Sequence, residues 1–257
     1  MKLFFKKTGE GKPLIILHGL FGLGDNWATL SKSFSENGFC CYLVDQRNHG
    51  RSRHSEEFTY EIMAEDLFEL MNDEKINTTD IIGHSMGGKT AMFFALNHSD
   101  RIRKMIIADM APRYYSQHHP AIFSALKSID TSDLSSRKEA EELLRNALND
   151  EATVQFLLKN LYWKEDKKLA WRFGFLEIEK NIKEIGKALP PDSVINVPVL
   201  FLRGERSGYI NEKDVMEIKR IFPSAEIKTV PAAGHWVHAE NPKAFMELAL
   251  GFLAIEY

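Results

Sequence analysis

The segment that most constrains this chain is residues 80–89, where a strand pattern, a tight turn and a helix pattern follow one another directly. The turn has the order G-x-S-x-G at residues 83–87, with Ser85 in the middle. This order predicts a sharp strand-to-helix turn that exposes the serine hydroxyl, because a Cβ at either flanking glycine would collide with its neighbours. The helix start behind Ser85 would leave backbone N–H groups free to bind a negatively charged oxygen.

Strand-like and helix-like patterns alternate on both sides of this turn. The predicted strands are 3–6, 14–17, 39–44, 80–82, 104–108, 197–202 and 225–230. Helix-like patterns follow most of them, and their predicted capping residues include Asp25, Asn211 and Asn241. The alternation predicts an α/β fold with a mostly parallel, twisted sheet and helices on both faces.

The alternation breaks between residues 112 and 190, where we find no strand and only helix-length patterns. Pro190 and Pro191 close this insertion. The sequence therefore predicts two units. Residues 1–111 and 191–257 form the core domain, and residues 112–190 form a helical cap inserted after the strand that ends at Asp109.

Composition excludes several classes of protein. A net charge of −3 gives no electrostatic reason to expect binding to nucleic acid or to an anionic membrane. No run of eighteen apolar residues predicts a membrane span, and three apolar residues near the N-terminus are too few for a signal peptide. Cys40 and Cys41 are adjacent and would point to opposite faces of a strand, so we expect no disulfide. We expect a cytoplasmic protein; its oligomeric state is left open.

A serine hydroxyl is a weak nucleophile, so it needs a base, and the base needs a carboxylate that fixes its tautomer. His235 follows the last predicted strand and therefore lies at the same carboxyl edge of the sheet as Ser85. Open α/β sheets bind their ligands at that edge. We expect His235 to be the base.

The other histidines are interpreted differently. His238 could pair with His235 in a metal site, but no third ligand stands at a comparable spacing, so no metal is expected. His18 and His84 flank glycines in two turns and are interpreted as structural. The rest are given no role beyond solvent exposure: His49, His54, His98, His118 and His119.

Two loops compete to supply the carboxylate. Asp109 follows the strand 104–108, and Glu205 follows the strand 197–202. We favour Asp109, because an acid one strand from the turn reaches the histidine if its loop bends inward. Asp109 could instead be an ordinary turn residue beside Pro112. Asp45 lies on the far side of the central strand and should be too remote.

A serine nucleophile also needs two N–H donors for the oxyanion that forms during attack. Met86 supplies one as the residue after the nucleophile, and we expect Leu20 in the glycine-rich turn 18–24 to supply the other. Apolar residues that could line a substrate pocket are Phe21, Phe123, Trp163 and Trp236. The alternative for the cap aromatics is that they only pack the cap helices together.

A different class of function is a nucleotide-binding oxidoreductase. Gly19, Gly22 and Gly24 follow a strand, and Asp45 ends the next strand, where a ribose-binding acid would stand. The glycine order is G-x-x-G-x-G, the reverse of the dinucleotide fingerprint, and the turn at Ser85 would have no purpose. We therefore expect no cofactor.

Taken together, these motifs resemble the α/β-hydrolase superfamily. They are His18-Gly19, the run 45–52, residues 83–88 and Gly234-His235. Residues 18–22, 25–27, 47–50, 87–89 and 109–112 are similar, more narrowly, to the small YbfF-type carboxylesterases. That resemblance implies hydrolysis of small-molecule esters or thioesters such as acyl-CoA, a helical cap, and an acid after the strand that precedes the cap.

The last implication fits Asp109. The position that holds the acid more commonly in the superfamily, three residues after Gly204, is Ser207 in this chain. Hydrolysis of carbon–carbon bonds and perhydrolysis use the same three residues and are the alternatives within the fold.

Overall fold

A computed structural model describes residues 1–116 and 120–255. Seven strands form one sheet in the order β1-β3-β2-β4-β5-β8-β9, in which only β1 is antiparallel to its neighbour. The strands are β1 (Phe4–Thr8), β2 (Lys12–Leu17), β3 (Phe39–Asp45), β4 (Thr79–His84), β5 (Ile102–Ala108), β8 (Val199–Gly204) and β9 (Glu226–Val230). The predicted mostly parallel sheet is confirmed.

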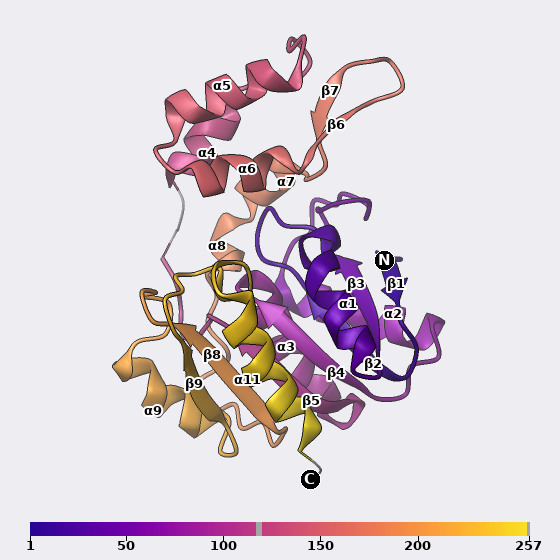
Figure 1. The fold of residues 1–257 in the computed structure, drawn as a ribbon, viewed down its shortest axis with the longest axis vertical. Coiled ribbons are helices and arrows are strands. Elements are labelled where there is room, and N and C mark those ends of the chain that lie inside the picture. Colours follow the sequence, from indigo (N-terminus) through magenta and orange to yellow (C-terminus); the bar gives the residue numbers. More distant parts are fainter. Residues whose placement is uncertain (117–119, 256–257) are drawn as a thin grey trace.

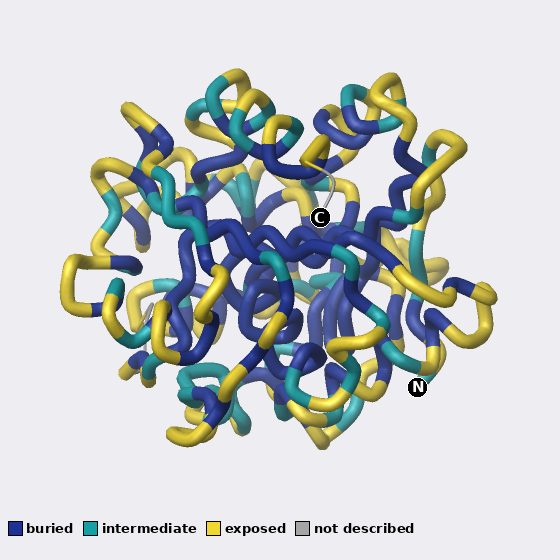
Figure 2. The backbone as a smooth tube through the Cα atoms, turned by 90° about the horizontal axis from the view of Figure 1, so that it is seen from below, coloured by how far each residue is buried: buried dark blue, intermediate teal, exposed yellow. Residues whose placement is uncertain are grey.

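Helices cover both faces of this sheet (Figure 1). One apolar cluster contains residues of α2 (Tyr60–Asp73), α3 (Met86–His98) and α9 (Glu212–Ile221). The other contains residues of α1 (Ala28–Glu36) and α11 (Pro242–Ala254). Figure 2 shows the buried backbone running through the middle of the molecule between more exposed segments.

The two cysteines confirm the alternation of side chains along β3. Cys40 packs in the first cluster and Cys41 in the second, and both thiols are free. Neighbours in a strand point to opposite faces, so the two sulfur atoms serve different cores. The prediction that they form no disulfide is confirmed.

Two of the three predicted helix caps are confirmed. Asn211 accepts a hydrogen bond from the backbone N–H of Lys213 at the start of α9, and Asn241 accepts one from Ala244 at the start of α11. The prediction for Asp25 is wrong: Gly24–Trp27 is a short 3-10 turn, and α1 begins only at Ala28. Asp25 instead forms an exposed ion pair with Lys6, at 2.6 Å.

The described residues between β5 and β8 form five helices, and most of this segment lies at one end of the molecule in Figure 1. They are α4 (Pro120–Lys127), α5 (Arg137–Ala147), α6 (Glu151–Leu158), α7 (Phe175–Lys180) and α8 (Ile182–Ile185). The expectation that it holds no strand is wrong, because β6 (Leu161–Trp163) and β7 (Leu169–Trp171) form an antiparallel hairpin. Each of these strands has only three residues, which are too few to show an alternating pattern in the sequence.

The fully buried Lys89 on α3 connects the core to both ends of this segment. Its Nζ donates to the carbonyl oxygens of Pro112 and Arg113 at 3.0 and 2.6 Å, and to that of Lys187 at 2.6 Å. The N–H of Leu189 also donates to the carbonyl of Pro112. The chain therefore leaves and rejoins the core at one place, and the cap limits at residues 112 and 190 stay a prediction.

Burial and the nearby Arg113 charge lower the pKa of Lys89 to about 7. The three carbonyl acceptors act in the opposite direction, because only the ammonium form has three protons to donate. Replacing Lys89 with methionine should reduce the free energy of unfolding by about 2–4 kcal/mol, because it leaves buried carbonyls without a donor. Thermal denaturation measures this change.

Lys104→Met is the matched control. Lys104 is also buried and donates to the carbonyls of Phe252 and Leu253, at the end of α11. Both variants should melt earlier, but only Lys89→Met should speed trypsin cleavage after Arg113 and Lys187. Equal cleavage of the two variants would contradict a linker role for Lys89.

Over the described residues, no helix is both long and apolar enough to cross a membrane.

Candidate active site

Ser85 stands in the sharp turn between β4 and α3. Its φ of 52° lies in the left-handed region, which a non-glycine residue adopts only under strain. A Cβ on Gly83 would lie 2.4 Å from the carbonyl oxygen of Gly87, and one on Gly87 would lie 2.3 Å from that of Leu17. The predicted requirement for glycine at both positions is therefore confirmed.

A continuous chain of hydrogen bonds joins Ser85, His235 and Asp109. His235 Nε2 lies 3.0 Å from Ser85 Oγ, and His235 Nδ1 lies 2.8 Å from Asp109 Oδ2. The three residues follow β4, β9 and β5, at the carboxyl ends of parallel strands. This is the geometry in which an imidazole accepts a serine proton while a carboxylate holds its tautomer.

Glu205 is not in contact with the histidine. It is exposed, and its carboxylate accepts a hydrogen bond from the N–H of Ala232 at 2.7 Å. Asp109 is fully buried and also accepts hydrogen bonds from the N–H of Gly204, at 3.0 Å, and from the hydroxyl of Ser207. Ser207, at the position where the superfamily more commonly has the acid, thus donates to the acid present here.

Glu240 fixes the loop that carries His235, a role the sequence analysis missed. Its carboxylate accepts hydrogen bonds from the N–H groups of Gly234 and Trp236, at 2.8 and 3.2 Å. The ring of Tyr209 stacks on the imidazole of His235, with centroids 3.6 Å apart. His84 Nε2 contacts the carbonyl of His235 at 2.9 Å. Contacts to its ring, to its loop and to its backbone carbonyl therefore hold His235 in place.

Burial raises the pKa of the Asp109 carboxyl to about 7. The hydrogen bonds from Ser207 and Gly204 act in the opposite direction because they stabilise the carboxylate. A carboxylate that orients the histidine must be ionised, so the active form should be lost as the pH falls through this region. Because the two groups interact, the acid limb reports the Asp109–His235 pair.

Replacing Ser207 with alanine removes one donor to the carboxylate and should move the acid limb of the kcat profile to higher pH by about one unit. Rates measured from pH 5 to 9 on a chromogenic ester test this shift. Ser224→Ala is the control, since its hydroxyl donates to the carbonyl of Val197 and does not touch the site. An unmoved acid limb in Ser207→Ala would contradict the effect assigned to this hydroxyl.

The loop after β2 carries Leu20 and Phe21, which line the same cavity as Ser85. The Phe21 amide is already used, since it donates to His49 Nε2 at 3.1 Å. For the amides of Leu20 and Met86 no acceptor is found within the described part of the protein. Leu20 and Met86 therefore stay the predicted donors to an oxyanion.

The interpretation of His49 as an exposed residue is wrong. His49 is fully buried, its Nδ1 lies 2.9 Å from the carbonyl of Arg47, and burial holds its pKa well below the usual value. The neutral ring can thus donate to Arg47 and accept from Phe21. The only sequence signal for this role is the run of residues 47–50, which follows a strand adjacent to β2.

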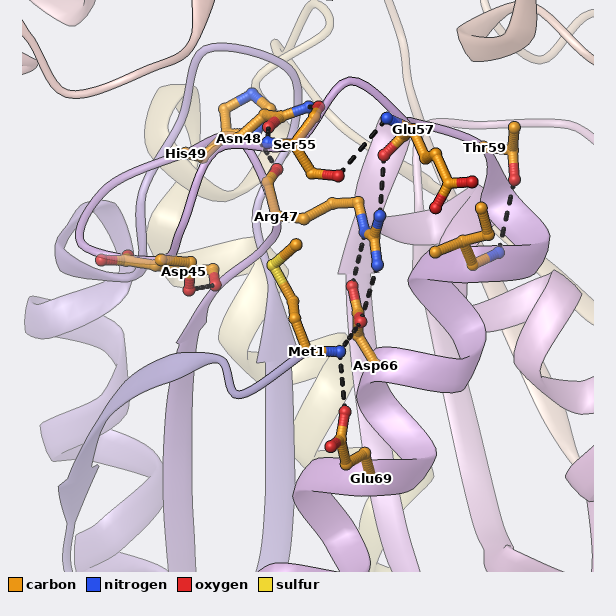
Figure 3. Close-up of polar contacts among 12 residues, drawn as sticks. Met1, Asp45, Arg47, Asn48, His49, Ser55, Glu57, Thr59, Asp66 and Glu69 are labelled. Carbon is orange, nitrogen blue, oxygen red and sulfur yellow. Dashed lines mark hydrogen bonds and ion pairs between the residues drawn. The ribbon is translucent and has the colours of Figure 1, made fainter. Parts of the chain in front are cut away.

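A buried ion pair fixes the loop after β3, which carries His49 (Figure 3). Arg47 donates to both carboxylate oxygens of Asp66, at 2.6 and 2.8 Å, and to the carbonyl of Glu57 at 2.7 Å. Such bidentate pairing sets the orientation of the guanidinium group as well as its position. A line of contacts therefore runs from α2 through Arg47 and His49 to the loop that carries the Leu20 amide.

The other histidines occupy different environments. His18 accepts a hydrogen bond from the N–H of Gln46 at 3.0 Å, which confirms its structural interpretation. His238 is buried and stacks on Trp27, with ring centroids 4.1 Å apart. No group of three metal-binding side chains is found among the described residues. His54 is exposed, His98 is partly buried, and His118 and His119 lie outside the described residues.

The structure gives no support to a dinucleotide site at Asp45. This carboxylate is buried and accepts hydrogen bonds from the N–H groups of Gly24 and Arg51, at 2.7 and 2.9 Å. A ribose would have to displace both contacts. Asp45 is therefore a residue that fixes two loops.

A cavity of about 500 Å³ lies between the cap helices and the loops around Ser85. Of the four predicted pocket residues, Phe21 and Trp236 line it. Phe123 is buried behind it and packs against Phe21, with ring centroids 5.3 Å apart. Trp163 does not reach the cavity, because it ends β6 in the hairpin and is 48% exposed.

The sheet order, the strained serine turn and the Ser85–His235–Asp109 contacts together define an α/β hydrolase. A family model described as the alpha/beta hydrolase fold matches residues 12–242. The chain belongs to this family and is an enzyme of its esterase and lipase type.

Comparison with individual proteins shows which members of this family the chain is similar to. The chain is 35% identical to Esterase YbfF of Escherichia coli, over 95% of this chain and 94% of the relative. It is 36% identical to the sn-1-specific diacylglycerol lipase ABHD11 of Danio rerio, over 97% and 80%. A solved structure of a marine microorganism esterase superposes with a TM-score of 0.95 at 47% identity, covering 98% of this chain and 99% of the other. The expected likeness to YbfF-type carboxylesterases is confirmed.

Proposed function

We propose that this enzyme is a serine hydrolase that cleaves carboxylic esters through an acyl-enzyme on Ser85. The observation that carries the proposal is the continuous hydrogen-bond chain from Ser85 Oγ through His235 to Asp109 at the wall of a 500 Å³ cavity. A base within 3.0 Å of the hydroxyl and a buried carboxylate behind it are the parts that serine nucleophiles require.

The first half of the reaction transfers the acyl group to the enzyme. His235 Nε2 takes the Ser85 proton as Oγ bonds to the carbonyl carbon, and the negative charge moves to the carbonyl oxygen. The amides of Leu20 and Met86 donate to that oxygen. Loss of one such donor typically lowers kcat by about a hundred- to a thousand-fold. The imidazolium then protonates the leaving oxygen as its bond to the carbonyl carbon breaks.

The second half releases the acid. Water loses a proton to His235 and attacks the acyl-Ser85 carbonyl, and the imidazolium returns the proton to Ser85 Oγ as the ester bond breaks. Asp109 stays ionised throughout and holds the Nδ1–H of His235.

The substrate class is carboxylic esters, with acyl thioesters as a second group of substrates open to the same chemistry. The names of the relatives, an esterase and a diacylglycerol lipase, support an ester carbonyl as the target. A thiolate leaving group needs less help from the imidazolium than an alkoxide, because thiols are the stronger acids.

Turnover of matched substrates tests this proposal. We expect hydrolysis of p-nitrophenyl acetate and butyrate, followed by absorbance, and compare it with acetyl-CoA and butyryl-CoA, followed by thiol release. Hydrolysis of neither class by the folded enzyme would contradict the proposal. Turnover of CoA thioesters alone would keep the mechanism and replace the ester assignment.

A further inference from the structure

Ser85 lies where two cavities of very different size meet. The large cavity, of about 500 Å³, lies between the cap helices and the loops around Ser85, and Ser85 also lines a small cavity of about 40 Å³. Ser85, Leu20 and Tyr209 line both. His235 lines only the large cavity. A group bound in the large cavity can therefore contact His235, the proton donor, whereas a group in the small cavity cannot.

This difference between the cavities decides which one holds the acyl half of an ester and which one holds the alcohol half. The imidazolium of His235 must protonate the leaving oxygen, so the leaving group has to lie on the His235 side of the tetrahedral centre. The acyl chain then extends away from His235, past Met86, which lines the small cavity only. We propose that the small cavity binds the acyl chain and the large cavity binds the leaving group, so that the enzyme selects short acyl groups joined to bulky alcohols. This inference rests on the proposed function.

The size of the small cavity sets the length of the acyl chain. The small cavity, at about 40 Å³, offers less than a tenth of the space of the large one, at about 500 Å³, so it accepts only a short chain. We expect acyl groups from acetyl to butyryl to fit. Its apolar lining includes Met86, Met110, Ile182 and Ile185, which suits an unbranched hydrocarbon.

The walls of the small cavity are fixed by buried tyrosines. Tyr60 is fully buried, and its hydroxyl donates to the carbonyl of Ile185 at 2.7 Å. The hydroxyl of Tyr115 accepts from the N–H of Ala111 at 2.8 Å. Because both phenols are held by hydrogen bonds, a longer chain cannot push them aside without leaving buried polar groups unpaired.

The large cavity carries both apolar and polar groups. Trp236 and Phe156 lie in contact, with ring centroids 5.4 Å apart, and both line it. His238 also lines it, and among the described residues its buried Nδ1 has no hydrogen-bond partner. Burial holds the pKa of His238 well below the usual value, so its ring adds no positive charge to this wall. Asp150, Gln155 and Lys159 also line the cavity, so an alcohol with an apolar body and a polar atom fits these walls.

A matrix of esters tests the assignment. The acyl group is varied from acetate to octanoate on p-nitrophenol, and the alcohol is varied from methyl to 2-naphthyl on a butyrate. For the wild-type enzyme we expect kcat/KM to fall at least tenfold from butyrate to octanoate and to rise with the size of the alcohol. An acyl profile that is flat or rises to octanoate would overturn the inference.

Three variants show which cavity holds which group. Ile185→Ala and, independently, Ile182→Ala enlarge the small cavity and should raise kcat/KM for octanoate by about tenfold relative to butyrate, with the alcohol profile unchanged. Phe156→Ala, in the large cavity, should change the alcohol profile only. A shifted acyl profile in Phe156→Ala with none in the two isoleucine variants would show that the assignment is reversed.

Failure of the inference can be told apart from failure of the proposed function. An enzyme that hydrolyses esters in a Ser85-dependent way but with the wrong chain-length profile contradicts the inference alone. A folded enzyme that hydrolyses no ester contradicts both. Thermal denaturation of each variant confirms that it is folded before its profile is interpreted.

Discussion

Replacement of Ser85 by alanine is expected to lower kcat for p-nitrophenyl butyrate by about six orders of magnitude. The rate that remains comes from the oxyanion donors and from substrate binding. The hydroxyl forms the covalent bond to the acyl group, and no neighbouring side chain in the site can take its place. Alanine adopts the left-handed backbone at this position with the same strain as serine, so the melting temperature should stay close to that of the wild type.

Ser31→Ala is the matched control for this variant. Its hydroxyl is also buried and donates to the carbonyl of Ala28 in α1, away from the catalytic loops. Its kcat should stay within a few-fold of the wild type. Turnover by Ser85→Ala above one per cent of the wild type, after removal of contaminating esterases, would reject Ser85 as the nucleophile.

Replacement of Asp109 by asparagine is expected to lower kcat by about four orders of magnitude, because an amide at this position favours the wrong tautomer of His235. The amide nitrogen would donate toward Nδ1, so that the proton moves to Nε2, where it blocks acceptance of the Ser85 proton. Burst and steady-state kinetics on the same ester separate a slow acylation from a slow release of the acid.

Glu205→Gln is the control, because it changes a carboxylate of the competing loop in the same way. Glu205 contacts the backbone of Ala232 and not His235. Its kcat should change by no more than a few-fold. The opposite pattern, with a large loss for Glu205→Gln and a small one for Asp109→Asn, would move the acid to the loop after β8.

The parts of the fold and site that could be predicted are those with local causes. The turn at Ser85 has a short-range signature, since glycine is required on both sides of a strained residue. The position of His235 and Asp109 follows from the rule that parallel strands end at one edge of the sheet. Strand adjacency and family resemblance both favour Asp109 over Glu205, and Asp109 is the residue that forms the hydrogen bond to His235.

The parts that could not be predicted depend on contacts between distant segments. His49 reads as a solvated loop residue until the loop after β3 is folded against the loop after β2. Glu240 and Ser207 support the histidine and the acid from positions that no pattern singles out. Trp163 is aromatic and lies in the cap, but a three-residue strand turns it away from the cavity.

Mass spectrometry of the intact enzyme after reaction with a fluorophosphonate tests whether Ser85 is the nucleophile that His235 activates. We predict one adduct per chain, located on Ser85 by peptide mapping, with labelling slowed strongly in His235→Ala and absent in Ser85→Ala. A folded, wild-type enzyme that stays unlabelled, or that carries the adduct on another residue, would contradict it.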